Sequence, residues 1–486
     1  MIPTRSLSEV RAAGDLTWFQ PALDLLGSLP EHPDPNLRTY FAADADIYVG
    51  RAPGRLDVMG GIADYSGGLV LELPLACATY ALCQRQPEPR CRVATRRAGK
   101  WEGFQMELPL GSQASLAAWF REHEADRWAG YVVGVVQYCL ERAAAEGRDA
   151  PAGLRLLIDS SVPEGRGVSS SAALEVAAGA AVAAACGIEV SGPDLAAACQ
   201  LVENVVVGAP CGIMDQMTSA CGRRDRLLRL RCQPGTIEGH VAVPGGFRLY
   251  GIDSGISHQV SGADYGTVRT AAFMGYRLIA AAAGLPAERD GHRVRVADRR
   301  WNGYLANLTP AEFSSFVGLL PEQITGAEFL REYGGITDSA TEVRPERRYP
   351  VRQAARHPVG EQERVERFAG LLGHLAEQPE LAPELGTLMY ASHASYGACG
   401  LGSDGTDRLV ELVRAAGPVR GLFGAKITGG GSGGTVVVLG ASAAEAAVRE
   451  LAARYRAEAG RGGGVLERSG PGAVEAGVLY LRGRPS

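Results

Sequence analysis

The pattern of apolar and polar residues predicts a chain that contains both strands and helices. Apolar runs and alternations that are typical of strands occur at 46–50, 69–95 and 154–158. Alanine-rich or periodic segments predict helices at 7–13, 23–29, 116–145, 172–186 and 194–206. Several of the loops between these elements are rich in glycine.

A second series of elements begins beyond residue 240, with a strand predicted at 247–252 and a helix at 265–283. The 486 residues are enough for two domains, which we place at 1–240 and 241–486. Residues 288–365 are rich in Arg, Pro and Glu and are weakly periodic, so we expect an irregular insertion with short helices and solvated charges. Two further helices are predicted at 361–377 and 384–396.

The overall composition excludes several classes of protein. Hydrophobic residues make up 46% and charged residues 21% of the chain, as in an ordinary soluble globular protein. The net charge of −5 gives no general attraction to nucleic acid. The N-terminus has no apolar signal core, and the longest uncharged apolar run, 176–188, is too short to cross a bilayer. We therefore expect a cytoplasmic monomer or homodimer with no nucleic-acid or membrane partner.

Cysteine and lysine are both distributed in an informative way. The ten cysteines are scattered without a C-x-x-C pair, which indicates reduced thiols and neither a disulfide framework nor a zinc site. Lysine occurs only at Lys100 and Lys426, while every other permanently cationic side chain is arginine.

The clearest candidate for chemistry is a serine-rich loop between a predicted strand and a predicted helix. It reads Pro163-Glu-Gly-Arg-Gly-Val-Ser-Ser-Ser-Ala-Ala-Leu-Glu175. Glycines, small side chains and a helix N-terminus together present free N–H groups, which favours binding of an anion such as phosphate. The alternative is a buried helix that is merely capped by serine, which is a preferred capping residue.

Two other loops carry charged residues on frames of glycine and proline. The first, 51–68, contains Arg55 and Asp64 and is predicted to be a rigid loop, since its glycines and prolines exclude a long helix. The second, 208–212, precedes Asp215. The alternatives are a solvated surface turn for the first loop and a helix-capping carboxylate for Asp215.

A third glycine-rich run, Lys426-Ile-Thr-Gly-Gly-Gly-Ser-Gly-Gly434, precedes a predicted strand at 435–439. So many glycines indicate that the backbone approaches another group closely, although a flexible hairpin is the alternative. The sequence also contains G-x-G-x-x-G at 400–405. We reject a dinucleotide-binding interpretation of it, because a predicted helix precedes it where that motif requires a strand.

Taken together, these motifs resemble the GHMP family of small-molecule kinases, and within it the galactokinase branch. The resemblance runs from about residue 48 over most of the chain and rests on four motifs: Ala52-Pro-Gly-Arg with Asp64-Tyr65, Pro163 to Ala172, Cys211-Gly-Ile-Met-Asp-Gln216, and Thr428 to Gly434. It implies an α/β (α+β) fold of two domains, with ATP and substrate in the cleft between them.

The resemblance also implies roles for individual residues. Asp215 would be the base and Arg55 would neutralise charge on the transferred phosphoryl group, as phosphoryl transfer requires. Mg²⁺ would be held by Ser171, or by Ser170, together with Glu203, which are oxygen ligands suited to this ion. The implied sugar contacts are Asp64, Gly61, Ile62, Gly212 and Tyr265. The implied nucleotide contacts are Gly165, Gly167, Ser169, Ser170, Ser171, Ala172, Gly429 and Gly430. For Lys426 we expect a surface position, with a role near phosphate as the alternative.

The first loop departs from the galactokinase pattern. Where those enzymes read Gly-Glu-His-Thr-Asp-Tyr, this chain has Gly60-Gly-Ile-Ala-Asp-Tyr65. In the family the missing Glu and His lie near the C6 hydroxymethyl group of the hexose, so Gly61 and Ile62 remove its polar partners. L-Arabinose shares the C2–C4 configuration of galactose and lacks that carbon. This loop, together with the segments 399–408 and 301–304, also resembles the kinase portion of the plant L-arabinokinases.

These observations predict an ATP-dependent sugar 1-kinase that acts on L-arabinose, and we expect it to be a stand-alone kinase without the long N-terminal region of the plant proteins. A galactokinase or a uronic-acid kinase is the nearest alternative. A catalytically inactive sensor that binds sugar and ATP is another, but Arg55, Ser169–Ala172, Glu203 and Asp215 are all present.

Overall fold

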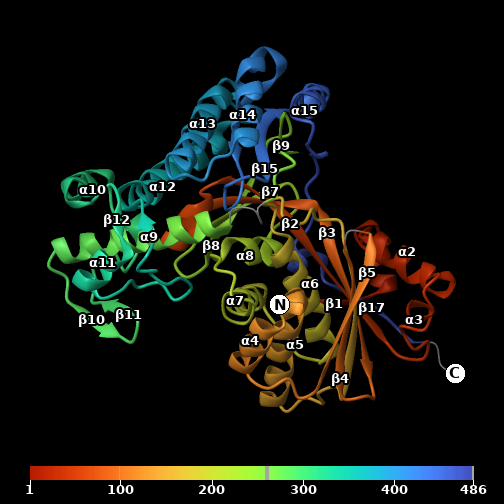
Figure 1. Cartoon of the computed structure of the whole chain (residues 1–486). Helices are drawn as coiled ribbons and strands as arrows, with labels where there is room; N and C mark the ends of the chain where they lie inside the picture. The colour runs from red at the N-terminus through yellow and green to blue at the C-terminus, as the bar shows by residue number, and fades with distance from the viewer. Residues whose placement is uncertain (98, 258–261, 484–486) are drawn as a thin grey trace.

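The computed structural model describes residues 1–97, 99–257 and 262–483. Within them, a mixed sheet of nine strands forms the centre of the N-terminal half, in the order β1-β17-β2-β3-β6-β4-β5, with β7 and β8 continuing from β3 (Figure 1). Its strands are β1 (Thr4–Ser6), β2 (Ile47–Met59), β3 (Leu69–Gln86), β4 (Arg90–Arg97), β5 (Lys100–Glu107), β6 (Gly153–Ser160), β7 (Arg226–Arg231), β8 (Thr236–Ala242) and β17 (Val478–Leu481).

Strand β2 corrects the prediction of a loop at 51–68. The strand continues through Pro53 and Gly54 as far as Met59, and only Gly61–Ser66 forms a short 3-10 turn. The pairing of β2 with β3 shifts its register between Pro53 and Arg55 and again between Asp57 and Met59. Such irregularities allow a strand to contain proline and glycine. Composition alone cannot reveal them, so it predicts a loop where the structure has a strand.

Helices cover one face of this sheet and create the larger hydrophobic core of the N-terminal half. They are α4 (Gln113–Glu122), α5 (Arg127–Ala145), α6 (Ser170–Ala185), α7 (Gly192–Val202) and α8 (Met214–Cys221). Helix α6 packs directly on β2 and β3, because its alanines and Gly50 of β2 allow the two backbones to approach closely. The N-terminal helices α1 (Leu7–Ala12), α2 (Gln20–Ser28) and α3 (Pro35–Arg38) pack in a separate hydrophobic cluster.

The C-terminal half is built on a four-stranded antiparallel sheet in the order β14-β15-β9-β16. These strands are β9 (Phe247–Asp253), β14 (Leu422–Ile427), β15 (Thr435–Ala441) and β16 (Val465–Leu466). The long helices of this half are α9 (Gly262–Ala282), α12 (Val351–His374), α13 (Ala382–Ala398), α14 (Asp404–Ala416) and α15 (Glu445–Ala459). Among the described residues, no helix is long and apolar enough to cross a membrane.

The predicted insertion consists of short elements, as expected, but it is not purely a solvated surface. It contains β10 (Ala287–Asp290), β11 (Arg293–Val296), α10 (Pro310–Phe316), β12 (Ile324–Thr325), α11 (Gly326–Tyr333) and β13 (Arg348–Tyr349). Trp301 is buried, and Asp338 forms a buried ion pair with Arg269 of α9. Helix α12 begins at Val351, ten residues before the predicted start at 361, because it accommodates Pro358 inside the helix.

The chain changes from the first sheet to the second between β8 and β9, and it returns to the first sheet at its end. After α16 (Ala473–Ala476), strand β17 pairs with β1 and β2. The proposed division into domains at residue 240 stays a prediction. All ten cysteines are free thiols in the structure.

Candidate active site

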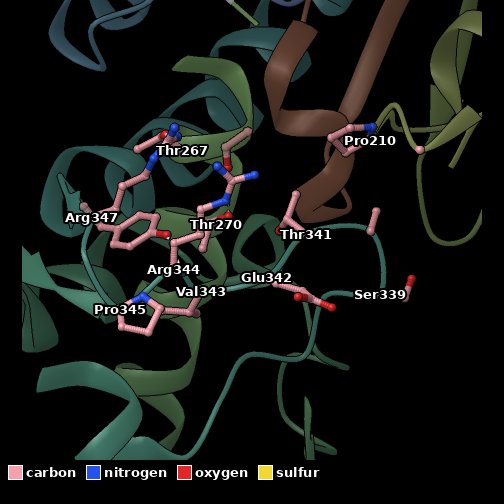
Figure 2. A pocket seen from close by; sticks show the side chains of 14 residues that line it. Pro210, Thr267, Thr270, Ser339, Thr341, Glu342, Val343, Arg344, Pro345 and Arg347 are labelled. Carbon is pink, nitrogen blue, oxygen red and sulfur yellow. Dashed lines mark hydrogen bonds between the residues drawn. The ribbon is translucent and has the colours of Figure 1, made fainter. Parts of the chain in front are cut away.

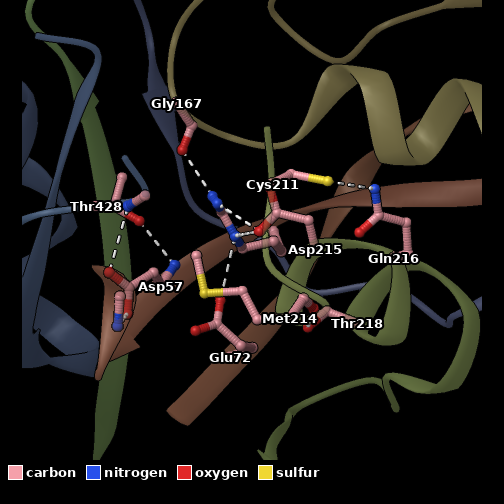
Figure 3. Close-up of polar contacts among 12 residues, drawn as sticks. Asp57, Glu72, Gly167, Cys211, Met214, Asp215, Gln216, Thr218 and Thr428 are labelled. Atoms are coloured by element: carbon pink, nitrogen blue, oxygen red, sulfur yellow. Dashed lines mark hydrogen bonds and ion pairs between the residues drawn. The ribbon is translucent and has the colours of Figure 1, made fainter. Parts of the chain in front are cut away.

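The centre of the candidate site is an ion pair between β2 and the start of α8. Arg55 Nε and Nη2 donate to the same oxygen of Asp215, Oδ1, at 3.0 and 2.8 Å. The third guanidinium nitrogen, Nη1, donates to the Gly167 carbonyl at 2.6 Å, and Glu72 of β3 lies 3.2 Å from Nε (Figure 3). Arg55 is thereby fixed between β3, the serine loop and α8.

A cavity of about 380 Å³ opens beside this ion pair. Most of the residues predicted for substrate and catalysis line it, although they come from distant parts of the chain. They are Arg55, Ile62, Asp64, Gly212, Asp215 and Tyr265, and the pocket is also lined by Glu203 from the predicted metal site and Gly430 from the predicted nucleotide site. We call this cavity the reaction pocket. Ala209, Pro210, Cys211 and Met214 complete its lining.

Asp64 is buried in the wall of the reaction pocket, against Gly212. A Cβ atom on residue 212 would overlap the Asp64 carboxylate, so only glycine fits there. Burial, followed by the negative charge of Asp215, raises the pKa of Asp64 to about 7, while the charge of Arg269 opposes the shift. Arg269 and its partner Asp338 were not predicted from the sequence. The i, i+4 spacing of Tyr265 and Arg269 on α9 is the signal that could have identified them.

The serine loop lies where β6 leads into α6, and its backbone adopts the conformation that its glycines permit. Gly165 and Gly167 have φ of 66° and 68°, and Ser169 precedes the helix in the same left-handed region, at 60°. The Ser169 hydroxyl is buried without a hydrogen-bond partner within the described chain, and Ala172 is buried in the helix. This loop therefore presents the N-terminus of α6 together with strained, small residues.

A second cavity, of about 160 Å³, adjoins the serine loop. It is lined by Gly165, Ser170 and Ser171 from the loop, and by aromatic and polar side chains that the sequence did not predict. The added residues include Thr79, Thr95, Arg97, Trp128 and Tyr131. An aromatic wall beside a helix N-terminus suits a ligand that carries both a ring and phosphates. No local motif marks these residues, because they come from two separate strands, β3 and β4, and from α5.

Glu203 is held beside the serine loop by a single π-helical turn, Glu203–Val207, which interrupts the end of α7. Its carboxylate accepts hydrogen bonds from Ser171 and from Gln216 Nε2, the latter at 2.6 Å. Burial, followed by the charge of Asp215, raises the pKa of Glu203 to about 7. One carboxylate and one hydroxyl fit a Mg²⁺ ion that takes its other ligands from phosphates and water. The described residues contain no group of three His, Cys, Asp or Glu that could hold a metal ion by itself.

The third glycine-rich loop connects β14 with β15 and packs against the serine loop. Gly429 and Gly434 have φ of 72° and 83°, and side chains at these positions would press on the backbone of Gly167 and Arg166. Gly430 lines the reaction pocket, while Thr428 Oγ1 accepts a hydrogen bond of 2.7 Å from the Asp57 backbone N–H (Figure 3). This loop therefore contributes to the reaction pocket and packs against the serine loop.

The expected surface position of Lys426 is wrong. Lys426 is fully buried in β14, and its Nζ lies 2.7 Å from Oδ2 of Asp57, which is also fully buried. The error has a physical reason: sequence shows that a lysine follows a strand pattern, but not that a carboxylate from a distant strand neutralises its charge.

Gly61 and Ile62, which were predicted together as sugar contacts, face different parts of the structure. Ile62 lines the reaction pocket, whereas a side chain on Gly61 would point at Tyr396 and Asp57. A Cβ atom there would overlap the Tyr396 hydroxyl, and Gly61 has a φ of 45°. The replacement of glutamate by glycine is therefore linked to a tyrosine that lies far away in the sequence.

A larger cavity, of about 660 Å³, lies between the insertion and the first turns of α9 (Figure 2). Arg344, Thr341 and Glu342 line it from the insertion, and Thr270 lines it from α9. Apart from Gly208 and Pro210, which precede the third predicted motif, it contains no part of the motifs described above. The residues predicted for chemistry therefore line the reaction pocket and not this cavity, although the reaction pocket is the smaller of the two.

Three family models match the chain: the GHMP kinases N terminal domain at 130–223, the GHMP kinases C terminal domain at 378–457, and the galactokinase galactose-binding signature at 37–85. The chain is 39% identical to the L-arabinokinase of Arabidopsis thaliana over 92% of its own length. It spans about half of that relative, 48%. It is 32% identical to the galactokinase of Chloroflexus aurantiacus, with 87% of the chain and 94% of that enzyme covered.

Solved structures share the fold. The galactokinase of Lactococcus lactis, complexed with galactose, superposes with a TM-score of 0.66 at 20% identity, covering 90% of this chain and 95% of that one. The mevalonate kinase of Methanococcus jannaschii superposes with a TM-score of 0.52 at 14% identity, covering 87% and 97% of the two chains. The predicted α/β (α+β) architecture is confirmed.

Proposed function

The chain belongs to the GHMP kinase family, as its motifs indicated, and we propose that it is an ATP-dependent sugar 1-kinase whose substrate is L-arabinose. One observation carries the proposal: Arg55, Asp215 and Asp64 line a single pocket, and Arg55 also bonds to the serine loop beside it. This places a carboxylate, a cation and a sugar-sized cavity next to a helix N-terminus that suits phosphate.

In the proposed reaction, the anomeric hydroxyl oxygen of the sugar attacks the γ-phosphorus of ATP, and the bond from that phosphorus to the bridging oxygen of ADP breaks. The hydroxyl proton passes to Asp215. Within the described residues, Oδ1 takes both hydrogen bonds from Arg55, so Oδ2 is left for the substrate. Arg55 orients this carboxylate and offsets the charge of the transferred group.

The serine loop and the third glycine-rich loop would bind the nucleotide phosphates, and the cavity lined by Trp128 and Tyr131 would take the adenine ring. Ser171 and Glu203 would hold Mg²⁺, which neutralises phosphate charge when it is bound. Asp64, Gly212 and Tyr265 would contact the sugar. Each of these assignments follows from the lining of the two cavities and from the family motifs.

The reaction pocket supports a pentose in preference to a hexose. At the position where galactokinases carry histidine, the pocket wall is the apolar Ile62, and Gly61 contributes no side chain. A C6 hydroxyl buried against this wall would lose its hydrogen bonds to water without replacement. The similarity to an L-arabinokinase agrees with this choice.

Galactose is the second candidate, because the chain also matches a galactokinase over most of its length and keeps Asp64 and Arg55. A uronic acid is disfavoured, since Arg55 is the one cationic side chain among the described residues that line the reaction pocket, and it is already bonded to Asp215. The retained Arg55, Asp215 and Glu203 argue against an inactive sensor.

The test is release of ADP from Mg-ATP by the purified protein, measured separately with L-arabinose, D-galactose and D-galacturonate, and with Asp215→Asn in parallel. We expect release that depends on L-arabinose and disappears in the variant. Release with galactose alone would retain the kinase and reject the pentose. If no sugar stimulated release, the sensor interpretation would replace the proposal.

A further inference from the structure

A buried cluster behind the reaction pocket joins the first loop to the third glycine-rich loop. It consists of Asp57 on β2, Tyr396 on α13 and Lys426 on β14. We propose that this cluster determines where the sugar pocket ends, because the Tyr396 hydroxyl occupies the space of a side chain at residue 61. The proposal rests on the proposed function and names the residues that set its substrate specificity.

Asp57 is the acceptor that binds both loops. Its Oδ1 accepts a hydrogen bond of 3.0 Å from the Gly61 N–H, on the sugar side. Its Oδ2 accepts from Lys426 Nζ at 2.7 Å and from the Gly429 N–H at 3.3 Å, on the nucleotide side. One carboxylate therefore fixes the backbone of both loops, and a buried lysine supplies its counter-charge.

Tyr396 makes a second bridge between the same two loops. Its hydroxyl accepts a hydrogen bond of 2.9 Å from the Ile62 N–H and donates one of 3.0 Å to the Gly429 carbonyl. The side chain of Ile62 lines the reaction pocket, so Tyr396 positions a residue of the pocket wall without lining the pocket itself. Tyr396 is therefore a positioning residue.

The same hydroxyl makes glycine obligatory at residue 61. A Cβ atom there would overlap the Tyr396 oxygen and would lie 2.6 Å from Asp57 Oδ2. The glutamate found at this place in galactokinases therefore cannot be introduced while Tyr396 keeps its position. Tyr396 thus excludes a polar side chain for the C6 hydroxyl at residue 61, so the loss of that partner depends on the cluster and not on residue 61 alone.

The position of Lys426 separates this proposal from a role near phosphate. Its Nζ lies over the ring of Tyr396, 5.3 Å from the centroid, and Lys426 has no exposed surface. It is absent from the described linings of both the reaction pocket and the cavity beside the serine loop. We therefore assign its charge to Asp57 and not to the nucleotide.

A double-mutant cycle in urea unfolding tests the steric part without requiring any activity. We expect Gly61→Ala to lower the urea midpoint strongly in the wild-type background, and much less in a Tyr396→Leu background, because the overlapping oxygen has been removed. Gly397→Ala on α13 is the matched control, since a Cβ atom there meets nothing within 4 Å. Equal losses for Gly61→Ala in both backgrounds would overturn the proposal.

Steady-state kinetics test the positioning role. We expect Tyr396→Phe to raise the KM for both L-arabinose and Mg-ATP, by about fivefold or more, with a smaller change in kcat, since it leaves groups on both loops unpaired. Tyr390→Phe, on the same helix but stacked on Arg414, should leave both constants unchanged. A rise confined to the KM for ATP, or no rise at all, would contradict the bridge.

Substrate specificity gives the final test. Gly61→Glu with Ile62→His should not yield an active galactose kinase while Tyr396 is present, whereas adding Tyr396→Leu should raise the galactose/arabinose ratio of kcat/KM about tenfold or more over the wild type. An equal shift without the Tyr396 change would overturn the proposal. If no sugar stimulates the wild-type protein, the proposed function fails, and the urea cycle still decides the steric inference.

Discussion

Two buried ion pairs begin on the same strand, two residues apart, and have different surroundings. Arg55 pairs with Asp215, whose side chain is 24% exposed toward the reaction pocket, whereas Asp57 pairs with Lys426 and neither is exposed at all. The first pair leaves an oxygen of Asp215 available to a ligand. In the second pair, both oxygens of Asp57 are bonded to protein groups. Access, and not charge, therefore distinguishes the pair suited to chemistry from the pair suited to structure.

The two pairs should also contribute differently to stability. Removing charges from water is costly, and the cost is offset only when hydrogen bonds satisfy the remaining lone pairs and protons. Asp57 meets this condition through Gly61, Gly429 and Lys426. Asp215 is partly solvated, and removing its charge leaves Arg55 still paired with the buried Glu72. Substitutions in the two pairs should therefore have opposite consequences for turnover and for folding.

The largest effect is expected from Asp215→Asn. Without a proton acceptor on the sugar hydroxyl, turnover should fall about 10³-fold or more, at the upper end of what a general base contributes. ATP binding should change little, because the serine loop is intact. The measurement is ADP release together with an ATP-binding titration, with Asp149→Asn as an exposed control. If the variant kept more than a tenth of wild-type turnover, Asp215 would not be the base.

Lys426→Met should do the reverse, affecting folding more than chemistry. Removing one partner of a buried pair leaves an uncompensated charge and costs about 3–5 kcal/mol of the free energy of unfolding. The matched control is Arg85→Met, which breaks an exposed pair with Asp149 and should cost about 1 kcal/mol or less. Urea unfolding measures both. If the two substitutions cost the same free energy of unfolding, the buried Asp57–Lys426 pair would have no special role in stability.

Much of the site could be predicted from sequence because its chemistry lies in local motifs. The strand before the serine loop and the helix after it follow from residue type and spacing. That Arg55, Asp64, Glu203 and Asp215 lie at one pocket was implied by the resemblance to the GHMP kinases. Family resemblance supplied the likeness to galactokinases and L-arabinokinases, which the comparisons confirmed. The roles of the individual site residues stay predictions.

The errors arose where a distant segment decides the environment of a residue. Nothing near Lys426 in the sequence announces Asp57, and nothing near Gly61 announces Tyr396, because these contacts join residues more than 300 positions apart. Pro53 by itself indicates a loop, whereas pairing with β3 keeps it in a strand whose register shifts there. Long-range packing overrides local propensity in each case.

Glu203 also lines the reaction pocket, so a substitution there tests whether a second accessible carboxylate has a chemical role like that of Asp215. We expect Glu203→Gln to raise the Mg²⁺ concentration needed for half-maximal turnover by about 10–100-fold or more, because loss of even a hydrogen-bond partner of a metal ligand commonly costs that much affinity. Glu141→Gln on the surface of α5 is the control, and a Mg²⁺ titration at saturating ATP gives the result. An unchanged Mg²⁺ requirement would remove Glu203 from the metal site and weaken the link between access and chemistry.

The smallest effect concerns Asp64, the buried carboxyl in the pocket wall. Its pKa is raised to about 7 by burial and by the charge of Asp215, whereas an aspartate in the unfolded chain titrates near 4. Between about pH 4 and pH 7 the folded protein therefore binds more protons at this residue than the unfolded chain does. The contribution of Asp64 to stability should consequently fall as pH rises through this window and should stay constant above it.

Thermal unfolding between pH 5 and pH 8 measures this contribution. The melting temperature of the wild type should fall more between pH 5 and pH 7 than that of Asp64→Asn, whose amide resembles the protonated acid and does not titrate. Glu203, whose pKa is also raised, is present in both proteins, so the difference between the two curves isolates Asp64. Asp149→Asn, at an exposed position, should follow the wild type. Parallel curves for wild type and Asp64→Asn would show that water reaches the Asp64 carboxyl freely. The Asp64 carboxyl beside Gly212 would then have to be more accessible to solvent than the neighbouring Arg55–Asp215 ion pair.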